Sequence, residues 1–332
     1  MSKKILNDPK NAVAEAIEGI VAASPDKIIQ YKSLPIVLKK ELTPGKVGLL
    51  IGGGSGHEPL FNGFVGKGFA DGAVSGNFFA APTPDIILEA TKAINRGLGV
   101  MYVYGNYAGD NMNFDIAAEF AYEESIKTKT VRVNDDIATE PEEERRGIAG
   151  DLFVIKIAGA AVEEYSTLEE VAKITEKAAK NTFSLGVALQ AGSHPETGEK
   201  TFELSDNEIE IGMGLHGEPG VVRQKLIKAD ELVDYMYSRL QKEMSLGSGD
   251  RISVLVNNLG STTSLELMIV NRRLQYKLQK DGVQVHDILI GSFCTTQEMA
   301  GFSISFLKLD DELLELYNKP ADSFALKIEG IQ

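Results

Sequence analysis

The sequence predicts an α/β protein made of two α/β domains: an N-terminal domain with a mostly parallel sheet flanked by helices, and a C-terminal domain with a mixed sheet. The length of 332 residues exceeds the usual size of one hydrophobic core. The composition, 43% hydrophobic and 25% charged, is typical of a globular protein. Over the first two thirds of the chain, short apolar runs alternate with amphipathic helical stretches, which is the pattern of a parallel sheet.

The first domain is expected to cover residues 1–183. Its strand at 46–51 is apolar throughout and runs directly into a glycine cluster. Thr83, Pro84 and Asp85 are favourable residues for the start of a helix. Ser166 and Thr167, followed by Glu169 and Glu170, predict a capping box at the start of another. The expected elements are a helix around 13–21, a strand at 46–51, a helix from 83 to about 97, a strand at 100–104, a helix from about 112 to 125, a strand at 128–133 and a helix from about 166 to 182.

Two local expectations concern this first domain. In the helix from about 112, the residues Phe114, Ala117, Phe120 and Ala121 are expected to face inward. The acidic stretch at 134–144 is interpreted as a solvated loop, with helix resuming at residues 145–147.

The second domain is expected to cover residues 184–332, with 184–200 as the passage into it. Its expected elements are a strand at 209–215, a helix from about 229 to 244, a strand at 252–256, a helix from about 264 to 279, and strands at 283–290 and 302–308. The sequence patterns of this half include some typical of parallel strands and some typical of antiparallel strands, which predicts a mixed sheet.

The charge balance limits the possible partners. The net charge of −14 repels polyanions, which argues against direct contact with nucleic acid or an anionic membrane face. One cysteine cannot form an internal disulfide, and the chain shows neither a signal peptide nor an apolar run long enough to span a bilayer. We therefore expect a cytoplasmic protein.

The run from Gly52 to Pro59 is the first motif that indicates a ligand site. Four glycines in five residues, including Gly54 and Gly56, let the backbone approach a ligand closely. The run lacks the Gly-Lys-Ser/Thr of a P-loop, and His57 stands where a dinucleotide fingerprint needs glycine. A glycine-rich turn after a strand is only a tight turn about as often as it is part of a ligand site. The presence of His57 directly after this one favours a ligand site.

His216 is the second such residue, since two of the four histidines lie on glycine-rich turns after predicted strands. His194 and His286 are interpreted as structural. A neutral imidazole can attack a ketone to give a hemiaminal. His57 and Asp110, at the edge of the sheet where ligands bind, could then move the proton and hold the hydroxyls, although Asp110 alone would be a turn residue by default. A metal is the rival interpretation, but no close histidine spacing supports it, so neither metal nor cofactor is expected.

Six ordered motifs stand out along the chain, at residues 52–59, 82–85, 106–110 with 113–114, 145–147, 206–220 and 256–260. They resemble the dihydroxyacetone kinase K subunit family, and the resemblance covers nearly the whole chain.

The resemblance implies a homodimer of two-domain α/β chains that binds dihydroxyacetone as a hemiaminal on His216. Gly54 and His57 would contact the substrate, and Asp110 would hold the hydroxyl that is phosphorylated and help to deprotonate it. Ser55, Gly56 and Gly105 complete the predicted ligand-binding residues. In the phosphotransferase-system kinases of this family, a separate L subunit carries the ADP.

The chain departs from the family pattern around the predicted site. Gly105 stands where the family usually has lysine, Ala80 and Ala81 replace hydroxyl residues, and a shortened loop at 140–144 carries four glutamates. These departures favour a co-activator paralogue of the family, linked to glycerol metabolism, that binds dihydroxyacetone and engages a TetR-like transcription factor. The alternative is a true K subunit that works with an L subunit. A metal- or nucleotide-dependent enzyme is a weaker third possibility, and glyceraldehyde or another short carbonyl compound remains open as the ligand.

Overall fold

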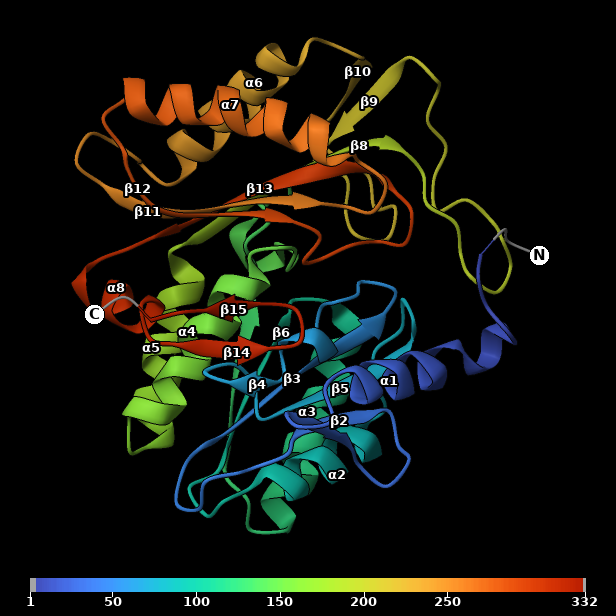
Figure 1. The fold of residues 1–332 in the computed structure, drawn as a ribbon, viewed down its shortest axis with the longest axis vertical. Coiled ribbons are helices and arrows are strands. Elements are labelled where there is room, and N and C mark those ends of the chain that lie inside the picture. The colour runs from blue at the N-terminus through green and yellow to red at the C-terminus, as the bar shows by residue number, and fades with distance from the viewer. Residues whose placement is uncertain (1–3, 331–332) are drawn as a thin grey trace. The chain divides into compact units, whose positions relative to one another are not determined.

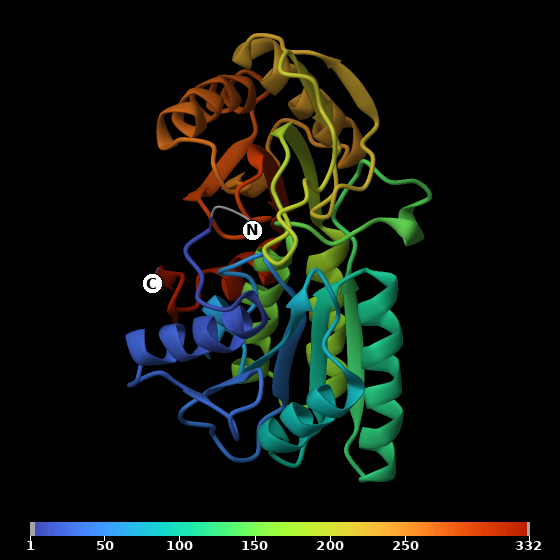
Figure 2. The same ribbon diagram turned by 90° about the vertical axis from the view of Figure 1, so that its right-hand side faces the viewer.

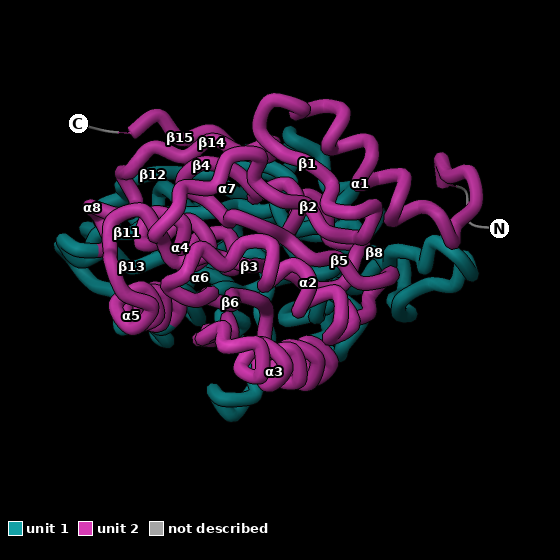
Figure 3. The backbone as a smooth tube through the Cα atoms, turned by 90° about the horizontal axis from the view of Figure 1, so that it is seen from below, with its two compact units in different colours: residues 1–2, 134–150, 180–312 teal, residues 3–133, 151–179, 313–332 magenta. Residues whose placement is uncertain are grey.

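The computed structural model describes residues 4–330 and divides the chain into two compact units. Within the described residues, unit 1 comprises 134–150 and 180–312, and unit 2 comprises 4–133, 151–179 and 313–330 (Figure 3). The units are therefore interleaved along the chain. The sequence predicted two consecutive domains with a boundary between 183 and 184, whereas the structure assigns 134–150 to the later unit and the C-terminal segment to the earlier one.

Unit 2 is built on a six-stranded sheet in the order β1-β2-β5-β3-β6-β7 (Figure 1). The strands β5, β3, β6 and β7 are parallel to one another, and β1 and β2 are antiparallel additions beside β5 at one edge. A small sheet, β15-β14-β4, accompanies it. The strands are β1 (Ile28–Gln30), β2 (Ile36–Lys39), β3 (Gly48–Ser55), β4 (Gly66–Lys67), β5 (Gly72–Phe78), β6 (Val100–Gly105), β7 (Thr128–Val133), β14 (Ala321–Ser323) and β15 (Lys327–Ile328).

Helices cover both faces of this sheet (Figure 2). On one face of the sheet, an apolar cluster that includes Leu50, Tyr102 and Phe114 fills the space between the sheet and the helices α2 and α3. On the other face lies α4, in which nearly every residue is buried. Such double coverage explains why the parallel strands read as continuous apolar runs. The helices of unit 2 are the 3-10 helices η1 (Pro9–Asn11) and η2 (Asn62–Phe64), and the α-helices α1 (Ala12–Ala23), α2 (Pro84–Ile94), α3 (Ala108–Glu123), α4 (Asp151–Glu164), α5 (Leu168–Lys180) and α8 (Asp311–Tyr317), of which α5 and α8 each have one end in unit 1.

Unit 1 contains a second six-stranded sheet, in the order β10-β9-β8-β13-β11-β12, of which only the pair β11 and β12 is parallel. The helices α6 and α7 pack against it over a large apolar core. Its elements are η3 (Glu142–Glu144), β8 (Thr182–Gln190), β9 (Glu208–Ile211), β10 (Val222–Lys225), α6 (Ala229–Glu243), β11 (Arg251–Asn258), α7 (Ser264–Lys280), β12 (Gln284–Gly291) and β13 (Ala300–Lys308).

The predicted fold class is confirmed: one unit has a mostly parallel sheet between helices and the other a mixed sheet. The capping box before α5 is also confirmed, since the Thr167 backbone N–H donates to the Glu170 carboxylate at 3.1 Å and the Glu170 N–H donates back to the Thr167 hydroxyl at 3.2 Å.

Several local expectations were wrong. Residues 145–147 are not helical, and the next helix, α4, begins only at Asp151. Residues 184–200 are not merely a passage, because residues 184–190 belong to β8 inside the second sheet. The strand expected at 209–215 ends at Ile211. Phe120 does not face inward: it is 42% exposed, because α3 buries only the stripe that contains Phe114, Ala117 and Ala121.

Across residues 4–330, no helix combines the length and the apolar character needed to cross a bilayer.

Candidate functional site

The glycine-rich run forms the end of β3 rather than a separate loop, since the strand continues to Ser55. A Cβ on Gly53 would lie 2.4 Å from the ring of Phe61, and one on Gly54 would lie 2.8 Å from the backbone nitrogen of Ala80. These glycines therefore let other parts of the same chain pack directly on the strand. The Ser55 hydroxyl donates to the Gly76 carbonyl at 2.7 Å, so this predicted ligand-binding side chain already has a partner in the chain.

His57 lies just beyond β3 and is buried. The chain turns there because Gly56 adopts a φ of +109°, which a side chain would disfavour. The Gly56 N–H donates to both carboxylate oxygens of Glu58 at 3.1 Å. The imidazole of His57 packs against the ring of Phe79, with centroids 5.3 Å apart and planes tilted by 49°.

The neighbouring strand β6 brings Gly105 and Asp110 to the same edge, because β3 and β6 are adjacent and parallel. The segments that follow β3 and β6 therefore leave the sheet at the same edge, as expected of the edge where ligands bind. By default, Asp110 would have been interpreted as a residue of a loop turn. In the structure it is instead helical and buried, because α3 begins at Ala108 and Asp110 lies in its first helical turn. A carboxylate there is stabilised by the positive end of the helix dipole. Burial, opposed by the hydrogen bond from Arg132, raises the pKa of the nearby Tyr104 to about 12, and the charge of Asp110 contributes.

His216 belongs to unit 1, on a loop that follows β9. Its Nδ1 lies 2.9 Å from Oε1 of Glu218, and its backbone N–H donates to the other oxygen of the same carboxylate. The imidazole side chain is 25% exposed. An ionised carboxylate can only accept, so Nδ1 carries the proton and the lone pair of the ring lies on Nε2.

The electrostatics of this pair favour an ionised Glu218. Burial acts to raise the pKa of Glu218, but the hydrogen bonds and charge of His216 outweigh it and lower the pKa to about 2. Arg146 lies close by, because a Cβ on Gly214 would meet both its guanidinium and the Glu218 carboxylate within 2.5 Å.

Arg146 also anchors the start of the loop. It pairs with the buried Asp136 at 2.6 Å and donates to the carbonyl of Gly212 at 2.9 Å. The acidic stretch is therefore only partly the solvated loop that its composition indicated: residues 140–144 are exposed, whereas residues 135–137 are buried.

The structure groups the predicted site residues by unit. Six of them lie in unit 2, namely Gly54, Ser55, Gly56, His57, Gly105 and Asp110, and His216 lies in unit 1. Sequence reasoning missed Glu218 as a functional residue, although the His-x-Glu spacing was visible. It also gave no role to Arg146, although the motif at 145–147 contains it, or to Asp136, because their pairing across ten residues and the contact of Arg146 with Gly212 are decided by the fold.

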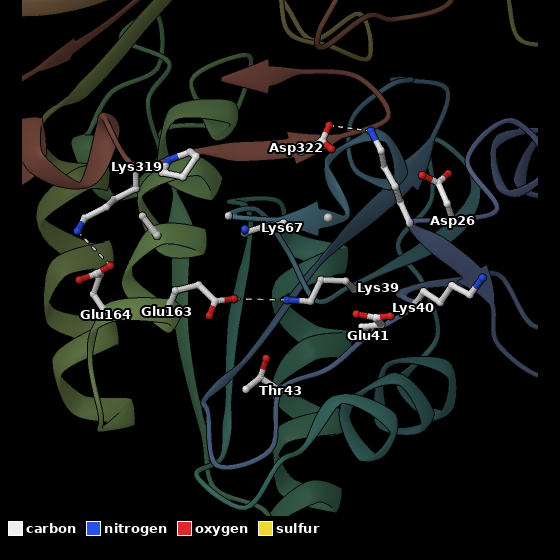
Figure 4. A pocket seen from close by; sticks show the side chains of 15 residues that line it. Asp26, Lys39, Lys40, Glu41, Thr43, Lys67, Glu163, Glu164, Lys319 and Asp322 are labelled. Atoms are coloured by element: carbon white, nitrogen blue, oxygen red, sulfur yellow. Dashed lines mark hydrogen bonds and ion pairs between the residues drawn. The ribbon is translucent and has the colours of Figure 1, made fainter. Parts of the chain in front are cut away.

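A cavity of about 540 Å³ elsewhere in unit 2 contains none of the predicted residues (Figure 4). It is lined by lysines and carboxylates around β4 and β14, and most of its lysines are neutralised within the chain. Lys27 pairs with Asp322 at 2.7 Å, and Lys319 pairs with Glu164 at 3.1 Å. Within residues 4–330, no three histidine, cysteine or acidic side chains are grouped so as to hold a metal ion.

Comparison with known proteins identifies the family. The Dak1 domain model matches residues 18–325. A subunit of Listeria innocua, named as the dihydroxyacetone-binding subunit DhaK of PTS-dependent dihydroxyacetone kinase 2, is 43% identical over 330 residues, covering 98% of this chain and 100% of that subunit.

Two solved structures have the same fold. The dihydroxyacetone kinase of C. freundii has a TM-score of 0.90 and 33% identity, over 99% of this chain and 61% of that one. The dihydroxyacetone kinase operon co-activator Dha-DhaQ has a TM-score of 0.89 and 29% identity, over 94% of this chain and 97% of that one. Since the family model spans nearly the whole chain and these matches agree with it, this chain belongs to the Dak1 domain family.

Proposed function

We propose that this chain captures dihydroxyacetone as a hemiaminal on His216. The observation that carries the proposal is the contact between Glu218 and Nδ1 of His216, because it leaves Nε2 as the nucleophilic nitrogen. The relative from Listeria innocua is named as a dihydroxyacetone-binding subunit, which supports the choice of ligand. The pair resembles other sites in which a carboxylate fixes the tautomer and the orientation of a reactive imidazole.

In the proposed reaction, Nε2 of His216 attacks the carbonyl carbon, a carbon–nitrogen bond forms, and the carbonyl double bond becomes a single bond to oxygen. The oxygen takes up one proton, and Nδ1 keeps its own, so the adduct carries a positive imidazolium charge that the ionised Glu218 carboxylate compensates. The product contains all the atoms of the histidine and of the ketone, with no loss of water. No oxidant and no cofactor is needed, and the reverse reaction releases the ketone unchanged.

The unit 2 residues are assigned the remaining roles. His57 would supply the proton to the developing alkoxide, and its buried position would limit exchange of that proton with water. Asp110 would accept a hydrogen bond from a hydroxyl group of the ligand, as a buried carboxylate at a helix N-terminus can. Gly54, Ser55, Gly56 and Gly105 would contact the ligand beside these groups.

For the role of the captured ligand, we propose a co-activator that engages a TetR-like transcription factor. Two features support this role: Gly105 has no side chain that could carry a positive charge, and Glu142, Glu143 and Glu144 form an exposed acidic turn that would repel a phosphoryl-bearing partner. One structural neighbour is named as an operon co-activator, which is compatible with this role.

The second candidate is the dihydroxyacetone-binding subunit of a phosphotransferase-system kinase, which would work with an ADP-bearing L subunit. It is favoured by the 43% identity to such a subunit over 98% of this chain.

We also propose that the chain is a homodimer. The strand β12 forms an edge of its sheet, and its apolar residues Val285, Ile288 and Ile290 are only partly buried. An edge strand of this kind can pair with its copy across a two-fold axis.

Sedimentation equilibrium should give the mass of a dimer at micromolar concentration, and a monomer there would contradict the proposal.

Intact-protein mass spectrometry under native conditions tests the adduct directly. Addition of dihydroxyacetone should raise the mass of the protein by one complete ketone molecule. The variant His216→Ala should show no such increase, because the nucleophile is absent, while His194→Ala, on an exposed loop, should behave like the unsubstituted protein. An adduct that persists in His216→Ala would reject the assignment.

Glu218→Gln should weaken the binding of dihydroxyacetone about 10- to 100-fold, since an amide cannot hold the proton on Nδ1 as strongly as a carboxylate. The lowered pKa of Glu218 means that its charged form, and the stability that comes with it, is present above about pH 4.5 and is lost only as the pH falls toward 2. Calorimetric titrations at pH 5 and pH 7 should therefore show the same penalty for Glu218→Gln. Glu203→Gln, on the exposed part of the same unit, is the control.

A coupled phosphotransfer assay with an L subunit separates the two roles. The co-activator role predicts that the chain binds dihydroxyacetone but supports no turnover, and that it retains a TetR-like transcription factor in a ketone-dependent pull-down. Turnover at a rate typical of kinases would overturn the co-activator role in favour of the kinase subunit.

A further inference from the structure

The segment that follows β5 contains a turn with an unfavourable backbone conformation. The Ala80 N–H donates to the Asn77 carbonyl at 3.1 Å, which closes a four-residue turn with Phe79 in its third position. Phe79 has a φ of +55°, in the left-handed region where turns favour glycine or asparagine. A bulky aromatic residue is disfavoured there and persists only when its surroundings hold it.

The surroundings that hold this turn belong to the glycine-rich end of β3. The Phe79 N–H donates to the Ser55 carbonyl at 2.9 Å. The backbone of Phe79 and Ala80 packs directly on Gly54, where a Cβ would approach the Ala80 nitrogen to 2.8 Å. The turn is therefore fixed against the residues that lead into His57, and all these contacts lie within unit 2.

The left-handed conformation of Phe79 directs its side chain to the imidazole of His57. The two rings are 5.3 Å apart and tilted by 49°, a favourable arrangement for an aromatic pair. Glycine at position 79 would suit the turn better but would leave the imidazole without this neighbour. A residue kept in a strained conformation beside a candidate proton carrier fits the pattern of strain that persists at functional sites.

We propose that Phe79 is a positioning residue for the capture reaction. Its ring limits the rotation of the His57 imidazole and covers one of its sides, so that the ring nitrogen stays directed at the ketone oxygen. This inference rests on the proposed function, because it assigns a purpose to Phe79 only if His57 transfers the proton. It also adds a residue that contacts neither the ketone nor His216 in the proposed reaction.

Three substitutions separate the backbone from the ring. Phe79→Gly removes both the strain and the ring, Phe79→Ala removes the ring and keeps the strain, and Phe79→Leu keeps an apolar side chain without an aromatic face. Ser125→Gly is the matched control, because Ser125 also has a positive φ, of +61°, and lies in the same unit in the exposed turn after α3. The measurements are thermal unfolding, calorimetric affinity for dihydroxyacetone, and the NMR signals of the His57 ring without ligand.

Phe79→Gly should unfold at the same temperature as the unsubstituted protein or higher, like Ser125→Gly, and yet bind dihydroxyacetone at least about tenfold more weakly. The His57 ring signals should shift in all three Phe79 variants, which lose the ring current, and stay in place in Ser125→Gly.

Unchanged affinity in Phe79→Gly and Phe79→Ala, or His57 signals that do not move, would overturn the inference. If those variants still show the adduct on His216 by mass spectrometry, the proposed function stands while the role of Phe79 falls. Absence of the adduct in the unsubstituted protein would reject both.

Discussion

The hydrogen bond between the Glu218 carboxylate and Nδ1 of His216 is the interaction on which the proposed chemistry depends. It selects one tautomer of the imidazole, it orients the ring, and it keeps Glu218 ionised far below neutral pH. The same carboxylate accepts the backbone N–H of His216, so a single side chain fixes both the loop and the reactive ring. A reactive histidine without such a partner would rotate and exchange tautomers, and the attacking nitrogen would be available only part of the time.

The loop that carries this pair is fixed in turn by charges buried nearby. Asp136 and Arg146 form a buried ion pair, and Arg146 reaches the backbone of the loop at Gly212. Beside them, Asp135 is completely buried and accepts backbone N–H groups of Ile148 and Gly150 at 2.8 and 2.9 Å. Burial raises the pKa of Asp135 to about 6. Hydrogen bonds to its own buried carboxylates thus fold the segment 134–150, and the bond from Arg146 to Gly212 ties it to the rest of unit 1. This explains why the segment is neither a helix nor wholly a solvated loop.

In unit 2, the glycines at the end of β3 have an equally specific structural role because they lack side chains. Glycines at the end of β3 let the ring of Phe61 and the backbone of Ala80 pack against the strand. This close packing holds Phe79 in its left-handed conformation and brings its ring to His57. The glycine-rich motif therefore organises the candidate site through the chain's own contacts, in addition to any room that it leaves for a ligand.

The sequence by itself determined the fold class, the long helices and most of the central strands, because hydrophobic periodicity and capping residues are local properties. It also singled out His57, Asp110 and His216, since two of only four histidines and an aspartate at the ends of predicted strands are visible without a structure. Only the tertiary structure revealed the interleaving of the two units, the burial of Asp135 and Asp136, and the contact of Phe79 with His57. These features rest on partners far apart in the sequence, whose side-chain distances are decided by packing and by the pairing of buried charges, and no local pattern encodes them.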